Sequence, residues 1–286
     1  MKPRHEARVP EWRRRLLTRP AALGVVLVAL AIIATALLQG VRSSGEPGDD
    51  PMGPAGGEPA PAALRGGSAF STVEPGTQLP SGAECAQRIE RDPWEPRPRN
   101  AAANHSVPQD HAVPAWTENG YAPEMNSRII PRIDGQFTGT TNEIIAWGAC
   151  KWGFDADMVR AMAVEESNWR QSETGDVTDD PAKCVGGDTA PCPTSFGLLQ
   201  VKHTFRPGSY PYAQRHTAFN VDYALGAIRG CYEGWVTYLD SDYGPGDLWG
   251  CVGWHFSGEW KDPQAFDYIE RVQEELDAKP WLRWRG

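Results

Sequence analysis

The stretch Asp155-Ala-Asp-Met-Val-Arg-Ala-Met-Ala-Val-Glu-Glu-Ser-Asn-Trp169 predicts a helix that buries a carboxylate near its C-terminal end. One face of this helix combines four residues at helical spacing: Val159, Met162, Ala163 and Glu166. Because a buried carboxylate without a partner is costly, Glu166 is expected to be neutral, paired or functional. Burial favours the protonated form of a carboxyl group, which suits Glu166 to donate a proton to a leaving group near neutral pH.

Three further motifs follow this helix: Gly197-Leu-Leu-Gln200, Asn220-Val-Asp-Tyr-Ala-Leu-Gly226 and Tyr268-Ile-Glu-Arg-Val272. Together with the Glu166-Ser167 pair, they resemble the motifs of the goose-lysozyme-like lytic transglycosylases, the SLT-domain family of peptidoglycan-cleaving enzymes. The resemblance covers about residues 137–284, in the family's order. It implies a mostly α-helical, lysozyme-like catalytic domain, which we expect to occupy residues 137–286.

The resemblance makes Glu166 the catalytic acid. The competing interpretation is a helix-end carboxylate in an ordinary salt bridge, for example with Arg170 at position i+4. Glu165 is the rival candidate, because it lies on a neighbouring apolar stripe of the same helix. We favour Glu166, since it directly precedes Ser167, as the family motif requires.

The resemblance also implies residues that bind substrate. The counterpart of Ser167 orients substrate, although a serine here is equally able to bond back to the helix. The counterpart of Gln200 contacts the acetamido region of the sugar, and that of Tyr268 hydrogen-bonds the catalytic carboxyl. Four aromatic residues are candidates to line a saccharide groove, with one or two of them expected to contact glycan, since sugar rings stack on aromatic faces: Trp169, Trp254, Phe256 and Trp260.

The implied reaction is non-hydrolytic cleavage of the β-1,4 bond between N-acetylmuramic acid and N-acetylglucosamine in peptidoglycan. It forms a 1,6-anhydro ring and requires neither a metal nor an organic cofactor. One alternative is a hydrolytic muramidase on the same fold. Another is a non-catalytic cell-wall-binding or scaffold protein, favoured by one departure from the family pattern: His255-Phe256-Ser257-Gly258 replaces Tyr-Asn-x-Gly.

The N-terminal part predicts a membrane anchor. Residues 1–20 contain seven Lys or Arg residues, and residues 21–38 are eighteen uncharged, mostly apolar residues. We expect 1–20 to be a cytoplasmic leader and 21–38 a single transmembrane signal anchor in the cell membrane, with the C-terminal domain extracytoplasmic. The alternative is secretion after cleavage at Ala34-Thr-Ala36.

Two segments connect this anchor to the catalytic domain. Residues 40–83 are rich in Gly, Pro, Ala and Ser and are expected to form a disordered linker. Residues 84–136 are expected to form an irregular arm that packs on the core and is held there by Cys85. The formal net charge is −9 for the whole chain and +5 for residues 1–20, which leaves −14 for the remainder and disfavours a nucleic-acid partner.

The chain has six cysteines, all on the expected outer side, which predicts three disulfides in an oxidising compartment. Cys184 and Cys192 bracket a short loop and are expected to pair with each other. The other four, Cys85, Cys150, Cys231 and Cys251, allow three connectivities. No Cys-x-x-Cys occurs and the histidines lack ligand spacing, so no metal site is predicted.

Overall fold

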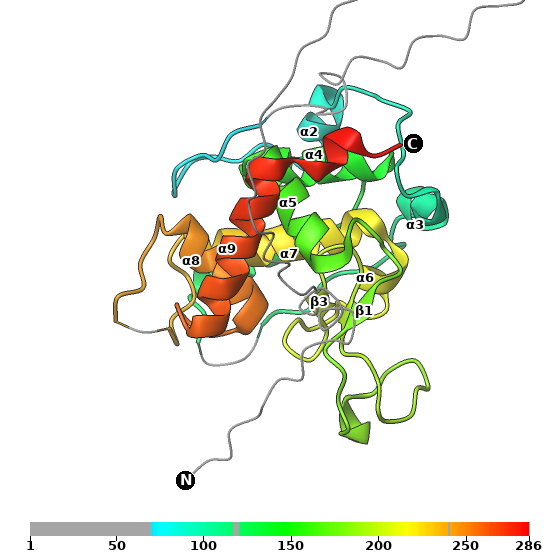
Figure 1. Ribbon diagram of the computed structural model, residues 1–286. Coiled ribbons are helices and arrows are strands. Elements are labelled where there is room, and N and C mark those ends of the chain that lie inside the picture. The colour runs from blue at the N-terminus through cyan, green and yellow to red at the C-terminus, as the bar shows by residue number, and fades with distance from the viewer. Residues whose placement is uncertain (1–69, 117–119, 240, 286) are drawn as a thin grey trace, which may run out of the picture. The chain divides into compact units, whose positions relative to one another are not determined.

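The computed structural model describes residues 70–116, 120–239 and 241–285, and these fold mainly into α-helices (Figure 1). The predicted mostly α-helical fold class is therefore confirmed for this part of the chain. The predicted leader, the predicted anchor and linker residues 40–69 lie outside the described residues. Within the described ranges, no helix is both long enough and apolar enough to cross a membrane.

The α-helices are, in chain order, α2 (Gly82–Arg88), α3 (Ala101–Asn104), α4 (Thr141–Trp152), α5 (Ala156–Ser167), α6 (Tyr212–Arg215), α7 (Thr217–Tyr232), α8 (Leu248–Ser257) and α9 (Pro263–Ala278). Short 3-10 or π turns occur at Pro98–Asn100, Met125–Ile129, Ile130–Arg132, Pro181–Lys183 and Pro280–Arg283. A small antiparallel sheet has the order β1 (Thr174–Gly175), β2 (Ser195–Phe196) and β3 (Val201–Lys202).

The sequence predicts helix starts at Thr140, which precedes Glu143 by three residues, and at Asp155, and the structure confirms both. The Thr140 side chain accepts from the backbone N–H of Glu143, and the Glu143 side chain accepts from the Thr140 N–H, so both halves of a capping box are present. α4 ends where Gly153 takes a left-handed conformation with φ of 66°. Two residues later, Asp155 caps α5 by accepting backbone N–H groups of its first turn.

One helix differs from the sequence expectation. The apolar periodicity predicts a helix over 221–239, but α7 spans Thr217–Tyr232. Gly234 has φ of 89°, the Trp235 N–H bonds back to the Gly230 carbonyl, and Val236 forms an isolated β-bridge with Tyr121. The apolar residues after Tyr232 therefore pack from a loop, because glycine allows the chain to turn there.

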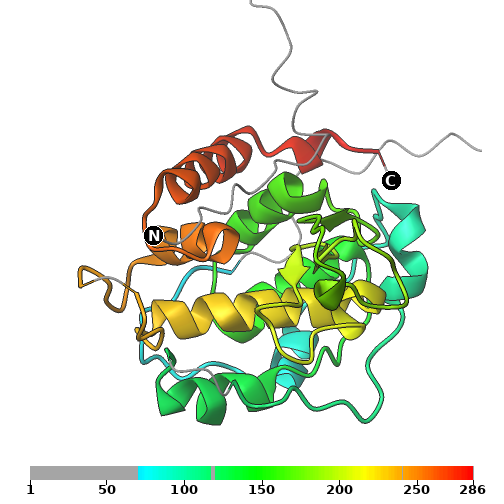
Figure 2. The same ribbon diagram turned by 90° about the horizontal axis from the view of Figure 1, so that it is seen from below.

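α7 contacts more of the other helices than α5 does, and α5 packs between α4 and α9. α9 packs against both α5 and α8, and α4 packs against both α5 and α7. Figure 2 shows α8 between α7 and α9. Residues 121 to 133 also contribute to the core, with Met125, Ile129, Ile130 and Ile133 buried, so the predicted arm is packed against the helices at several points.

Three disulfides are present, as predicted, and Cys184 pairs with Cys192. The connectivity that the sequence left open is Cys85–Cys150, which joins α2 to α4, and Cys231–Cys251, which joins α7 to α8. Disulfides persist in oxidising compartments, so three of them support an extracytoplasmic location for this domain.

The predicted linker is wrong for residues 70–83. The Val73 N–H bonds to the Gly153 carbonyl, and the Ala156 N–H bonds to the Phe70 carbonyl, both near 3.1 Å. Arg229 of α7 donates to the carbonyls of Val73 and Glu74 at 3.0 Å. The segment is held because its backbone pairs with groups at the ends of α4 and α5 and with a buried arginine.

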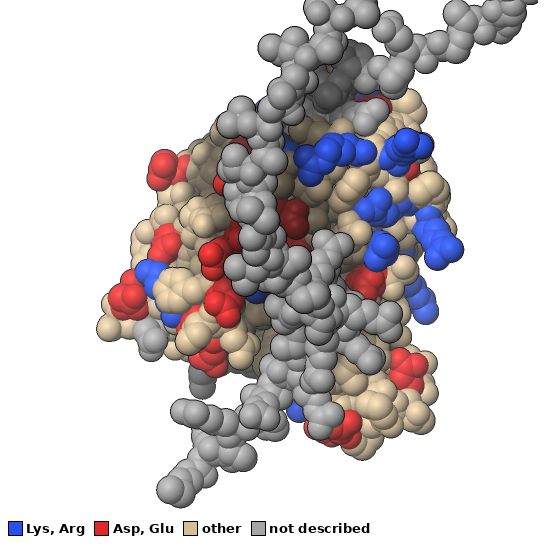
Figure 3. Space-filling model, viewed as in Figure 1, with Lys and Arg blue, Asp and Glu red and all other residues tan. Residues whose placement is uncertain are grey.

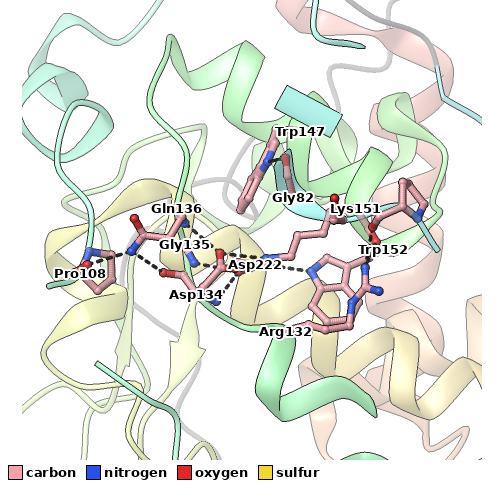
Figure 4. A network of polar contacts seen from close by, with 12 residues as sticks. Gly82, Pro108, Arg132, Asp134, Gly135, Gln136, Trp147, Lys151, Trp152 and Asp222 are labelled. Carbon is pink, nitrogen blue, oxygen red and sulfur yellow. Dashed lines mark hydrogen bonds and ion pairs between the residues drawn. The ribbon is translucent and has the colours of Figure 1, made fainter. Parts of the chain in front are cut away.

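A buried ion-pair network joins α4, α7 and the loop before α4 (Figure 4). Asp222 of α7 is fully buried, and its carboxylate accepts four hydrogen bonds: from Lys151 Nζ (2.8 Å), Trp152 Nε1 (2.7 Å) and the backbone N–H groups of Asp134 (2.8 Å) and Gly135 (2.9 Å). Lys151 also contacts the Asp134 carboxylate at 3.0 Å. The network satisfies a buried charge from three segments at once.

We predict that Asp222→Asn lowers the free energy of unfolding by about 3–5 kcal/mol, because Lys151 remains buried without its main counter-charge. The matched control is Asp134→Asn. Asp134 contacts the same lysine, but its side chain is 46% exposed, so this substitution should lower the free energy of unfolding by less than about 1 kcal/mol. Urea unfolding followed by tryptophan fluorescence measures both. Equal losses of unfolding free energy in the two variants would contradict the prediction, because they would show that burial of the ion pair does not determine its contribution to stability.

Candidate active site

The Gly197–Gln200 segment is a buried loop between β2 and β3. Leu198 and Leu199 are fully buried, so water cannot satisfy their backbone groups, and partners must come from the protein. The Leu198 N–H donates to Gln171 Oε1 at 3.1 Å, and the Leu199 N–H donates to Asn220 Oδ1 at 2.7 Å. Side chains from two separate parts of the chain therefore bind the two amides.

The two carbonyls of this loop are bound in the same way. Ser167 Oγ, at the end of α5, donates to the Leu198 carbonyl at 2.8 Å. His255 Nε2, on α8, contacts the Leu199 carbonyl at 3.1 Å and must act as the donor there, since a carbonyl only accepts. The loop thus joins the ends of α5 and α8 to α7.

Gly197 is required by this close packing. Its φ is 83°, and a Cβ atom at this position would lie 2.3 Å from Asn220 Nδ2. Asn220 in turn donates to the Phe196 carbonyl at 2.7 Å, so its amide is held against the loop backbone. Any side chain at Gly197 would displace the amide that binds Leu199.

Glu166 lies beside the Leu198–Leu199 loop and the side chains that bind it, at the C-terminal end of α5. It is buried, with 5% of its side chain exposed, and its Oε1 atom is 3.9 Å from His255 Nε2. The neighbouring Glu165 instead pairs with Arg271 of α9 at 2.6 Å. Of the two candidates, Glu166 is thus the carboxyl that shares its surroundings with Ser167 and His255, while Glu165 is part of a helix–helix contact.

His255 is neutral at physiological pH. Burial, and then the charge of Arg206, lower its pKa from 6.5 to about 4, against the opposing effect of its bond to the Leu199 carbonyl. Its contact with Glu166 is therefore an approach of a neutral imidazole N–H and not an ion pair. Sequence reasoning missed His255 as a site residue, although its place in the departing His255–Gly258 motif was a signal.

The other predicted substrate-binding residues lie in different settings. Ser167 is 3% exposed and engaged with the loop, so the geometry shows a positioning bond. Gln200, with φ of 43°, donates from Nε2 to the carbonyls of Gly197 (2.8 Å) and Glu173 (3.2 Å), which closes the hairpin. Its amide nitrogen is thus already occupied within the protein.

Tyr268 and Phe256 form a stacked pair between α9 and α8. Their ring centroids are 4.5 Å apart and the ring planes differ by 6°. Tyr268 is fully buried and Phe256 is half-buried. The Arg271 guanidinium lies 5.8 Å from the Phe256 centroid, so the arginine that pairs with Glu165 also covers this stack.

Trp169 is not a groove residue. It is fully buried, and its Nε1 donates to the Arg160 carbonyl at 3.0 Å. Its ring packs against Trp94, Trp281 and Trp284, at centroid distances of 6.0, 6.3 and 5.2 Å. The expectation of a sugar contact is wrong because the chain turns sharply after α5, where Asn168 and Trp169 both have positive φ, and directs the ring inward.

Charged side chains are separated on the face shown in Figure 3. Acidic residues gather over α8 and α9, while basic residues gather around α3, α6 and the C-terminus.

The described residues contain no group of three or more His, Cys, Asp or Glu side chains placed to hold a metal ion. Comparison with known protein families, curated proteins and solved structures finds no match.

The lowered pKa of His255 predicts a pH-dependent stability. The unfolded chain takes up a proton near pH 6.5, but the folded protein resists it until about pH 4. The free energy of unfolding should therefore fall as the pH drops through this window, by about 3 kcal/mol from this group alone. In His255→Gln, which keeps an N–H donor but does not titrate, that part of the loss should disappear.

Urea unfolding at pH 7.5 and pH 4 tests this, because losses from other groups cancel when wild type and variant are compared. His105→Gln is the control, since His105 is exposed beyond the end of α3. Parallel pH profiles for wild type and His255→Gln would contradict the prediction.

Proposed function

We propose that the protein is an extracytoplasmic peptidoglycan lytic transglycosylase with a lysozyme-like helical domain. The observation that carries the proposal is the buried Glu166 carboxyl at the end of α5, held beside the Leu198–Leu199 loop. A carboxylic acid removed from bulk water can donate its proton to a glycosidic leaving oxygen, and this is the step that the proposed cleavage requires.

In the proposed reaction, Glu166 protonates the glycosidic oxygen between N-acetylmuramic acid and N-acetylglucosamine. The positive charge that develops at C1 is stabilised by the acetamido group of the substrate. The Glu166 carboxylate then takes the proton of the C6 hydroxyl, whose oxygen attacks C1 and closes the 1,6-anhydro ring. Ser167 fixes the end of α5, and His255, whose N–H donates to the Leu199 carbonyl, fixes the loop beside the Glu166 carboxyl.

The proposed location is the outer side of the cell membrane, with residues 21–38 as the anchor. It is supported by the apolar sequence of that segment and by the three disulfides of the described domain. Glycan strands of peptidoglycan are the proposed partner.

Hydrolysis on the same fold is a second candidate function. It is favoured by Asp176, which follows β1 and accepts a 2.5 Å hydrogen bond from Ser195 Oγ. Lys202 Nζ is 3.4 Å from the same carboxylate, whose side chain is 45% exposed. A carboxylate that is open to solvent and close to a lysine is suited to activate water, as the second carboxylate of an inverting hydrolase does.

We predict that Glu166→Gln lowers the turnover of purified peptidoglycan by at least about 100-fold, because the proton donor is lost. Glu165→Gln is the matched control, with the same change on the adjacent residue, and should retain most of the activity. Mass spectrometry of the released muropeptides is the measurement. Products ending in 1,6-anhydro-muramic acid support the transglycosylase.

The same measurement separates the alternatives. Reducing muramic acid ends, lost in Asp176→Asn, would replace the transglycosylase with a hydrolase. If wild type and Glu166→Gln release equally little while both bind the wall, the enzyme hypothesis is wrong and a binding protein remains.

A further inference from the structure

Arg206 is a buried arginine that pairs with no acidic side chain of the described residues. It lies in the loop between β3 and α6 and is 8% exposed. Its guanidinium carbon is 5.2 Å from the ring centroid of Trp116 and 4.8 Å from that of Trp254. Among the described residues, no Asp or Glu oxygen lies within 4.0 Å of it. We name Arg206, Trp116 and Trp254 the Arg206 subsite.

The guanidinium has unused hydrogen-bond donors. Nη1 donates to the Phe205 carbonyl at 3.3 Å, whereas Nε and Nη2 bond to no described residue and are not sealed from solvent. Contacts with two aromatic faces offset part of the cost of burying a positive charge. They leave the donor fork unfilled, and that fork matches the geometry of a carboxylate.

The Arg206 subsite lies near the candidate acid. Trp254, which covers the guanidinium, directly precedes His255 in α8, and His255 Nε2 is 3.9 Å from Glu166 Oε1. The charge of Arg206 is also one of the two causes that lower the His255 pKa. An anion at Arg206 would therefore sit in the same region as the bond that Glu166 acts on.

Exposed aromatic rings adjoin the subsite. Phe205 is 61% exposed, and Tyr238 is 48% exposed while its hydroxyl accepts from Trp254 Nε1 at 2.7 Å. Aromatic faces beside an unfilled guanidinium suit a ligand with apolar ring faces and a carboxylate. Muramic acid residues and their stem peptides combine these two features.

We propose that Arg206 binds a carboxylate of the peptidoglycan strand and so selects muramic-acid-containing glycan over neutral glycan. This rests on the proposed function, since it places the anion beside Glu166. The carboxylate comes either from the lactyl group of muramic acid, where it is free, or from the stem peptide. Neutral oligomers of N-acetylglucosamine gain nothing from the guanidinium.

The test is calorimetric binding in the Glu166→Gln background, so that no strand is cleaved. Four probes are compared: strands with intact stem peptides, strands freed of peptides by an amidase, the same freed strands with their carboxyls converted to methylamides, and chitohexaose. Adding Arg206→Gln should weaken binding of carboxylate-bearing strands by about tenfold or more, and leave methylamidated strands and chitohexaose unchanged. Weaker binding of the peptide-bearing strands alone would identify the stem peptide as the source of the carboxylate. Weaker binding of the freed strands would identify the lactyl group.

Arg206→Lys is the matched variant, since it keeps the charge and loses the fork; it should show a smaller but still selective loss. Equal weakening for all four probes, as expected if Arg206 only supports its loop, would overturn the proposal, as would no binding of any strand. The product analysis on wild type is independent of these affinities. Absence of glycan cleavage would therefore remove the proposed reaction while selective carboxylate binding still stood.

Discussion

The need to satisfy the buried backbone of Leu198 and Leu199 is the constraint on which the site depends. Each of their four polar groups is bound by a different side chain, from Gln171, Asn220, Ser167 and His255. An unpaired buried amide or carbonyl costs about 1–3 kcal/mol, so the loop is stable only when all four side chains are in place. The ends of α5 and α8 and the start of α7 are thereby fixed relative to one another.

This constraint also determines the surroundings of Glu166. Ser167, the next residue, bonds the Leu198 carbonyl, and His255, which binds the Leu199 carbonyl, approaches the Glu166 carboxyl. Two of the side chains that hold the loop therefore lie next to Glu166: Ser167 is its neighbour in the chain, and His255 is its neighbour in space. Precise placement of a proton donor requires such support, because a small displacement weakens proton transfer steeply.

Local sequence signals predicted the features that depend on neighbouring residues. The capping box of Thr140, the Asp155 cap and the pairing of Cys184 with Cys192 all follow from short-range patterns and are confirmed. Features set by contacts between distant residues could not be predicted from the local sequence. Trp169 turns inward because it packs against three other tryptophans. Residues 70–83 are ordered because groups of α4, α5 and α7 bind their backbone. Nothing in the local sequence marks Arg206, whose aromatic partners are 90 and 48 positions away.

The departure at His255 bears directly on whether the protein is a catalyst or only a binding module. At this position the imidazole supplies a neutral N–H donor to the loop that supports Glu166, so the change of residue type leaves the support of the acid intact. A protein that only binds glycan gains no affinity from a carboxyl buried to 5% exposure, and the burial costs stability. A buried carboxyl that costs stability is the kind of feature that proteins retain at functional sites.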